Sequence, residues 1–95
     1  MKKVYICGPM TGLQEHNYPA FHAAEAKLLE DGYEVVSPAR LDHSANETWE
    51  DHMKTDIKAM MDCDTICVLP GADGSSGATK ERIIASWLKF DVITL

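Results

Sequence analysis

The sequence has no long uninterrupted hydrophobic run and few basic residues, and both deficits limit what the protein can be. No apolar run approaches the ~20 residues that a membrane-spanning helix needs. The first apolar run ends after four residues at Gly8-Pro9, too short for a signal-peptide core, so we expect a cytoplasmic protein. Nine lysines and arginines stand against fifteen acidic residues, and this net charge of −6 argues against binding to polymeric nucleic acid. A small phosphorylated ligand stays compatible with this charge, because a loop and a helix N-terminus can bind phosphate.

Cysteine and histidine are present, but not in a pattern typical of a metal site. The three cysteines are odd in number and two lie within apolar runs, so we expect reduced, buried thiols at Cys7, Cys63 and Cys67. The histidines, which show no His-x-x-x-His pair with a third ligand, are His16, His22, His43 and His52. We therefore expect neither a metal ion nor an organic cofactor. His16 and His43 fall in expected loops, where contact with a substrate and simple surface exposure are both open.

Short apolar runs alternate with segments of helical periodicity along the chain. The expected strands cover residues 4–7, 33–36, 65–69 and 92–95, and the expected helices cover about 18–31, 48–61 and 77–89. This alternation predicts an α/β fold, with a small doubly wound parallel sheet of four strands in the order 2-1-3-4 and three helices. Ligands of such sheets bind at the carboxyl ends of the strands, so the loops 8–17, 37–47 and 70–77 should surround one cleft.

Two acidic residues interrupt the apolar faces of the second and third helices. Asp56 falls among Trp49, Met53, Ile57 and Met60, and Glu81 falls among Ala78, Ile84, Ala85 and Leu88. Carboxylates are rarely buried unless they are paired or functional. A structural role, through a helix end or through pairing with a lysine or arginine, stays open. A functional pair would suit cleavage of a glycosidic bond, in which one carboxylate attacks the sugar and one acid protonates the leaving group.

Two turns rich in small residues are candidates for ligand binding. The turn 8–12 after the first strand lacks the dinucleotide fingerprint and the lysine of a nucleotide-triphosphatase loop, so NAD binding and ATP hydrolysis are not expected. A plain tight turn is equally compatible with it. Residues 75–77 precede the third helix, where a helix cap and an anion site can coexist. Tyr5 in the first strand is either a core aromatic residue or a phenol directed at Glu81.

Four segments resemble those of a known protein family in their order and spacing. They are YICGPMTG at 5–12, GYEVVSP at 32–38, Asp56 ahead of CDTI at 63–66, and SSGATKE at 75–81. Together they resemble nucleoside 2-deoxyribosyltransferases and the related 2′-deoxynucleoside 5′-monophosphate N-glycosidases. Short, often phage-encoded proteins placed beside that family are still more similar. The resemblance spans nearly the whole chain and implies a single domain of this kind over residues 1–95.

The resemblance also implies roles for individual residues. By position, Glu81 would attack the anomeric carbon of the sugar, Asp56 would bind and protonate the leaving base, and Tyr5 would orient Glu81. The implied substrate-binding residues are Gly8, Pro9, Met10, Thr11, Gly12, Ser75 and Gly77, with Ser75 and the turn 9–12 at the 5′ end. Ser75 favours a nucleoside 5′-monophosphate, because the nucleoside transferases tend to carry an acid at this position.

Three functions from different classes remain at this stage. The first is an enzyme that cleaves the N-glycosidic bond of a nucleotide or nucleoside, by hydrolysis or by base transfer. The second is a non-catalytic nucleotide-binding module, and the third is a small interaction protein in which both acids are structural. We expect a homodimer or larger homo-oligomer, because the chain is small and the family's site is shared between subunits. Trp87, opposite Glu81 on its helix, would then be a candidate for the interface.

Overall fold

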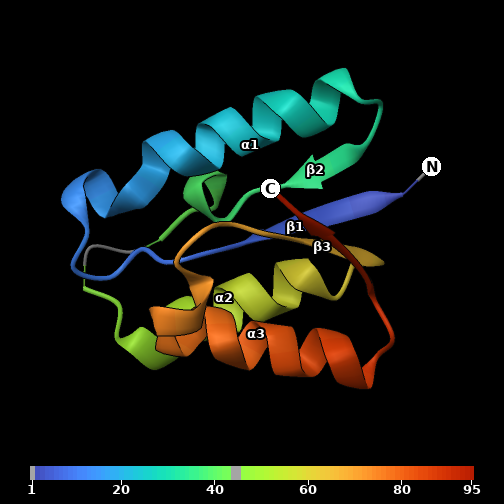
Figure 1. Cartoon of the computed structure of the whole chain (residues 1–95). Helices are drawn as coiled ribbons and strands as arrows, with labels where there is room; N and C mark the ends of the chain where they lie inside the picture. Colours follow the sequence, from blue (N-terminus) through green and yellow to red (C-terminus); the bar gives the residue numbers. More distant parts are fainter. Residues whose placement is uncertain (1, 44–45) are drawn as a thin grey trace.

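A parallel four-stranded sheet in the order β2-β1-β3-β4 forms the centre of the computed structural model, which describes residues 2–43 and 46–95 (Figure 1). The strands are β1 (Lys3–Cys7), β2 (Glu34–Val36), β3 (Thr65–Val68) and β4 (Asp91–Thr94). The strand order confirms the predicted topology. In the register of the two central strands, Tyr5 lies beside Ile66 and Cys7 lies beside Val68.

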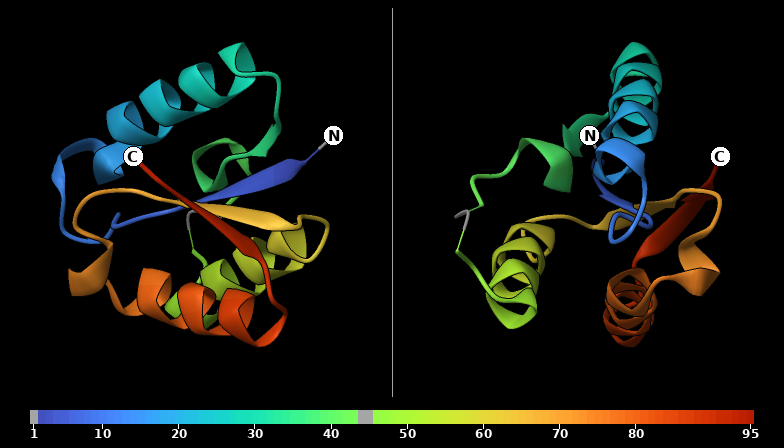
Figure 2. Two further views of the ribbon diagram at one scale, coloured as in Figure 1. Left: turned by 45° about the vertical axis from the view of Figure 1, so that its right-hand side comes forward. Right: turned by 90° about the vertical axis from the view of Figure 1, so that its left-hand side faces the viewer.

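Among the residues that the structure describes, three α-helices cover the two faces of this sheet. They are α1 (Tyr18–Glu30), α2 (Trp49–Met60) and α3 (Ser76–Trp87). Helix α1 lies on one face, and α2 and α3 lie together on the other (Figures 1 and 2). Among the described residues, no helix combines the length and the apolar character that crossing a membrane requires.

In the described part of the connections lie three short 3-10 turns, which the sequence did not predict. They are η1 (Gln14–Asn17), η2 (Pro38–Arg40) and η3 (Ala72–Gly74). Each turn lies in one of the three loops expected around the cleft. The loops therefore contain hydrogen-bonded structure that hydrophobic periodicity does not reveal, because each turn is only three or four residues long.

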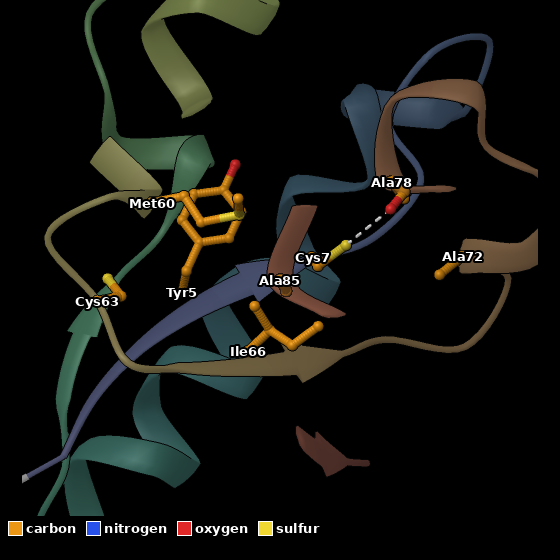
Figure 3. Close-up of a cluster of buried hydrophobic side chains, with 8 residues drawn as sticks. All are labelled: Tyr5, Cys7, Met60, Cys63, Ile66, Ala72, Ala78 and Ala85. Carbon is orange, nitrogen blue, oxygen red and sulfur yellow. Dashed lines mark hydrogen bonds between the residues drawn. The ribbon is translucent and has the colours of Figure 1, made fainter. Parts of the chain in front are cut away.

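The central strand β1 divides the core into two clusters. Val4 and Ile6 pack towards α1, whereas Tyr5 and Cys7 pack towards α2 and α3, as alternation along a strand requires. All four side chains are fully buried. Figure 3 shows the second cluster, in which Tyr5 lies beside Met60. This cluster lies directly beneath the side chains of the candidate site, because its Tyr5 contacts Glu81.

The described cysteines are free and buried, as expected for reduced thiols at Cys7, Cys63 and Cys67. Cys7 donates a hydrogen bond from Sγ to the carbonyl oxygen of Ala78, 3.3 Å away, and so ties β1 to the start of α3 (Figure 3). Burial raises the pKa of the Cys63 and Cys67 thiols to about 11. These thiols are neutral packing groups at physiological pH.

Helix α2 begins at a capping box, as its sequence indicates. The Thr48 hydroxyl accepts from the Asp51 amide, and the Asp51 carboxylate accepts from the Thr48 amide, which satisfies two otherwise free donors. Two assignments to apolar helix faces were wrong. Trp49 is 43% exposed because it stands at the first turn, beyond the sheet. Leu88 is 53% exposed because α3 ends at Trp87 and the chain turns away.

Candidate functional site

A cavity of about 500 Å³ lies at the carboxyl ends of the strands, where the sequence predicted a cleft. All three expected loops contribute to it. The first loop provides Gly8, Met10, Thr11, Gly12 and His16, the second provides Pro38, His43 and Glu47, and the third provides Ser75 and Gly77. Helices α2 and α3 provide the remaining wall, which includes both Asp56 and Glu81. A volume of this size is typical of a site for a small molecule.

Glu81 reaches the cavity from the second turn of α3 and is only 4% exposed. The Tyr5 hydroxyl donates a hydrogen bond to its Oε2 atom over 3.0 Å, so the phenol is directed at this carboxylate. Burial raises the pKa of Glu81 to about 7, against the opposing effect of the hydrogen bond from Tyr5. The pKa of Tyr5 lies well above its usual value, chiefly through burial and then through the charge of Glu81. Tyr5 therefore stays a hydrogen-bond donor to a carboxylate that can ionise near neutral pH.

Asp56 faces the same cavity from α2 and is also 4% exposed. Burial, and to a smaller extent the negative charges of Glu81 and Glu47, raises its pKa to about 8. The sequence left open a structural pairing of these acids with a lysine or arginine. In the described part of the chain the two cations that flank Glu81 have other partners, since Lys80 bonds to Ser76 and Arg82 to Asp73.

Two stacked histidines separate Asp56 from Glu47. The rings of His43 and His52 lie nearly parallel, at 13°, with centroids 3.9 Å apart. Both Nδ1 atoms lie 2.9 Å from Oε1 of Glu47. The Nε2 atoms face the other carboxylate, at 3.4 Å from Oδ1 of Asp56 for His43 and at 3.1 Å from Oδ2 for His52. Asp56 therefore lies between Glu81 and a histidine pair.

The first loop approaches the sheet closely. A side chain at position 8 would place its Cβ 2.9 Å from the Cβ of Leu69, so only glycine fits there. The Asn17 side chain donates to the carbonyl oxygen of Pro9 over 3.0 Å and holds the loop back on itself. Three consecutive residues, 15–17, have positive φ between 53° and 61°, a conformation that costs side-chain-bearing residues free energy. These contacts and backbone angles define the conformation of the loop, which forms one wall of the cavity.

Ser75 and Gly77 bring the N-terminus of α3 to the cavity. The Ser75 hydroxyl accepts from the Ala78 amide over 3.2 Å and caps the helix. A Cβ at position 77 would lie 3.1 Å from the sulfur of Met53, so a larger residue would press on α2. The positive end of the helix dipole and the free amides of the first turn therefore face the same space as the two acids.

Most residues singled out in the sequence line this one cavity. Pro9 is an exception, because it lines a neighbouring hollow, and Tyr5 lies beneath Glu81 in the core. The sequence did not single out Glu47 or assign a role to His52. The four-residue spacing between His52 and Asp56 on one helix was the available signal, because such residues lie on the same face.

The comparisons with known proteins agree with this architecture. A 2-deoxyribosyltransferase from the psychrotolerant bacterium Bacillus psychrosaccharolyticus has a similar fold, with a TM-score of 0.73 and 21% sequence identity. The similarity covers 97% of this chain and 70% of that one. No match was found among curated proteins. Residues 2–94 match the model of a family described as a domain of unknown function, DUF4406, and the chain belongs to that family.

Proposed function

We propose that this protein cleaves the N-glycosidic bond of a nucleoside 5′-monophosphate or nucleoside, with Glu81 as the nucleophile. One observation carries the proposal: the buried Glu81 carboxylate accepts a hydrogen bond from Tyr5 at the wall of a cavity that also holds Asp56. A carboxylate fixed by a hydrogen bond and shielded from water is suited to attack a sugar carbon. The fold shared with a 2-deoxyribosyltransferase supports the same chemistry.

The proposed reaction has two steps. A Glu81 oxygen forms an ester bond to the anomeric carbon while the bond from that carbon to the base nitrogen breaks. The electron pair of the broken bond goes to the base, which takes a proton from Asp56. In the second step, water or a second base attacks the anomeric carbon, gives up a proton to the Asp56 carboxylate and releases the Glu81 carboxylate, which gives hydrolysis or base transfer respectively.

The phosphate of a 5′-monophosphate would bind at the N-terminus of α3. Ser75 and Gly77 line the cavity there, and the first turn of a helix offers amide donors and a positive dipole end. Thr11 and Gly12 in the first loop line the same cavity and add a hydroxyl and a backbone amide. An anion site of this kind does not need a basic side chain, which is consistent with a chain of net charge −6.

We also propose that the protein forms a homodimer through α3 and β4. Trp87 is 76% exposed and Val92 62% exposed, and Ile83 is 47% exposed on the same helix as Trp87. Large exposed aromatic and aliphatic side chains that lie together are typical of protein interfaces. A groove of about 500 Å³ between these two elements includes Ile83 and Val92 in its walls.

The proposed reaction is tested by incubating the protein with a panel of nucleoside 5′-monophosphates and nucleosides and measuring free base by chromatography. Glu81→Gln keeps the size and hydrogen-bonding capacity of the side chain but removes the nucleophile, so release should fall by at least about a thousandfold. Glu30→Gln is the matched control, because Glu30 is exposed on α1, outside the cavity, and should leave release unchanged. Binding without release would favour a nucleotide-binding module, and neither binding nor release would contradict both functions.

A further inference from the structure

We propose that His52 is a positioning residue for Asp56, which holds the carboxyl group of the proposed acid and stabilises the carboxylate that remains when its proton leaves. This inference rests on the proposed function and names a further residue for the same reaction. Nδ1 of His52 lies 2.9 Å from Oε1 of Glu47, and Nε2 lies 3.1 Å from Oδ2 of Asp56. One imidazole therefore connects a carboxylate in the loop before α2 to the acid at the cavity wall.

The start of α2 places these three side chains in a row. His52 and Asp56 are four residues apart on α2, so their side chains lie on the same face, one turn apart. Glu47 directly precedes the Thr48 cap, and the capping box fixes the direction in which the chain enters the helix. The Asp56 side chain is only 5% exposed, so bulk water does not replace the imidazole at its carboxyl group.

The second ring of the stack, His43, packs against His52 without the same bonding. Nε2 of His43 lies 3.4 Å from Oδ1 of Asp56, and among the described residues both nitrogens of His43 are buried without a hydrogen-bond partner. Because the two rings are nearly parallel, their in-plane lone pairs point the same way and do not converge on one metal ion together with Glu47. The cluster therefore acts through His52 and its two acidic neighbours, and His43 fixes the plane of the His52 ring.

Asp56 lies among groups that oppose its ionisation. The titratable groups that face it are Tyr5 from β1, Glu81 from α3, His43 and Glu47 from the loop before α2, and His52 from α2 itself. Burial, and to a smaller extent the charges of Glu81 and Glu47, raises the pKa of Asp56 to about 8, so this acid holds its proton at neutral pH. The carboxylate left after transfer of that proton needs a stabilising partner, and the His52 ring is in contact with it.

In its imidazolium form, His52 has a proton donor at each ring nitrogen. Nδ1–H donates to the Glu47 carboxylate, which can only accept, and Nε2–H donates to Oδ2 of Asp56. In the first step of the proposed reaction, Asp56 transfers its own proton to the base nitrogen while His52 keeps both of its protons. In the second step, the Asp56 carboxylate regains a proton from the attacking water or base, so His52 ends the cycle unchanged. His52 acts through Asp56 and not on the reacting atoms.

The test compares His52→Phe with the unmodified chain in two measurements. The first is an NMR titration of the Asp56 side-chain carboxyl carbon, assigned with Asp56→Asn, which needs no substrate. The unmodified protein should show a midpoint near pH 8. Phenylalanine keeps a ring that stacks on His43 but has no nitrogen, so this midpoint should move upward by roughly one pH unit.

The second measurement is base release from nucleoside 5′-monophosphates. In His52→Phe, kcat should fall by about 10–100-fold while KM changes by less than about threefold, because the loss concerns proton transfer and not substrate binding. His52→Gln keeps an N–H donor for Asp56 without the charge, so it should restore part of kcat; it also guards against a phenylalanine variant that fails to fold. His22→Phe is the matched control, because His22 lies on α1 at the other face of the sheet, and it should leave both measurements unchanged.

The two measurements separate this proposal from the proposed function. An unchanged midpoint of Asp56 or an unchanged kcat in His52→Phe would overturn the role of His52, although base release by the unmodified protein would still support the proposed function. Absence of base release from the unmodified protein would contradict the proposed function, and the NMR titration alone would then decide whether His52 stabilises the Asp56 carboxylate.

Discussion

Replacing Glu81 with glutamine should make the protein more stable at alkaline pH, because the folded state buries a carboxylate that resists ionisation. The pKa of Glu81 is about 7 in the folded chain, against an ordinary value of 4.5. One pKa unit corresponds to about 1.4 kcal/mol, so burial of the ionised group costs roughly 3 kcal/mol of folding free energy above pH 7. Glutamine does not ionise, and its amide oxygen can still accept from Tyr5.

The sign of the pH dependence follows from proton binding. Between about pH 4.5 and pH 7, the folded state holds the Glu81 proton and the unfolded state has released it. Stability therefore falls as pH rises through this window and the deficit is constant above it. The stability advantage of Glu81→Gln should be small at pH 4.5, grow through the window and reach roughly 3 kcal/mol at pH 8. In a domain of this size each kcal/mol shifts Tm by roughly 4–8 °C.

Urea denaturation followed by tryptophan fluorescence and circular dichroism between pH 4.5 and pH 9 measures this difference. The neighbouring acid Asp56 is present in both proteins, but without the Glu81 charge its pKa is lower, which adds to the stability advantage of Glu81→Gln at alkaline pH. Glu30→Gln should shift stability by less than about 0.5 kcal/mol at any pH, because Glu30 is exposed. A Glu81→Gln advantage that is absent at pH 8, or that does not change with pH, would refute the reasoning.

Three further predictions concern other parts of the chain. Tyr5→Phe removes the hydrogen bond that lowers the pKa of Glu81, so the pH at which the proposed base release is half-maximal should move upward and kcat should fall; a pH–rate profile that coincides with that of the unmodified protein would contradict this. Gly8→Ala should destabilise the fold by about 1–3 kcal/mol in urea denaturation, because the added Cβ meets Leu69; an unchanged midpoint would be inconsistent with the close approach. Light scattering should give twice the mass of one chain, and Trp87→Glu should reduce it to the mass of one; a monomer before substitution excludes the dimer.

The parallel pairing of the strands was predictable because the signals for it are local, whereas the order 2-1-3-4, which the structure confirms, was one of several orders compatible with that pairing. The apolar runs 4–7 and 65–69 are typical of strands buried on both faces, and the helices between strands require parallel pairing with right-handed connections. The cap at Thr48 was equally visible, because it depends on residues three positions apart. The ends of elements were less certain. Leu88 was assigned to a helix face, although the chain leaves the helix at Trp87 and Lys89 adopts a left-handed conformation.

The candidate site was partly visible from sequence. Asp56 and Glu81 stood out because an acid within an apolar stripe is costly, and this cost is a property of each helix alone. The histidine cluster was not visible, since it joins His43 and Glu47 from a loop to His52 from a helix, in a spacing that matches no common metal motif. The burial of Trp49 was also predicted wrongly, because position on a helical wheel does not reveal that the helix end projects beyond the sheet.

The amino-acid order by itself determined the α/β architecture, the parallel pairing of the strands and the two acids on apolar helix faces, because hydrophobic periodicity, capping and chain connectivity act over short distances or through general rules. Only the tertiary structure decided that Tyr5 donates to Glu81 and that two histidines stack between Asp56 and Glu47. These contacts join β1 to α3 and a loop to α2, so they depend on how the layers pack. The pKa of Glu81 follows from the same packing, since desolvation by the surrounding core exists only once the chain has folded.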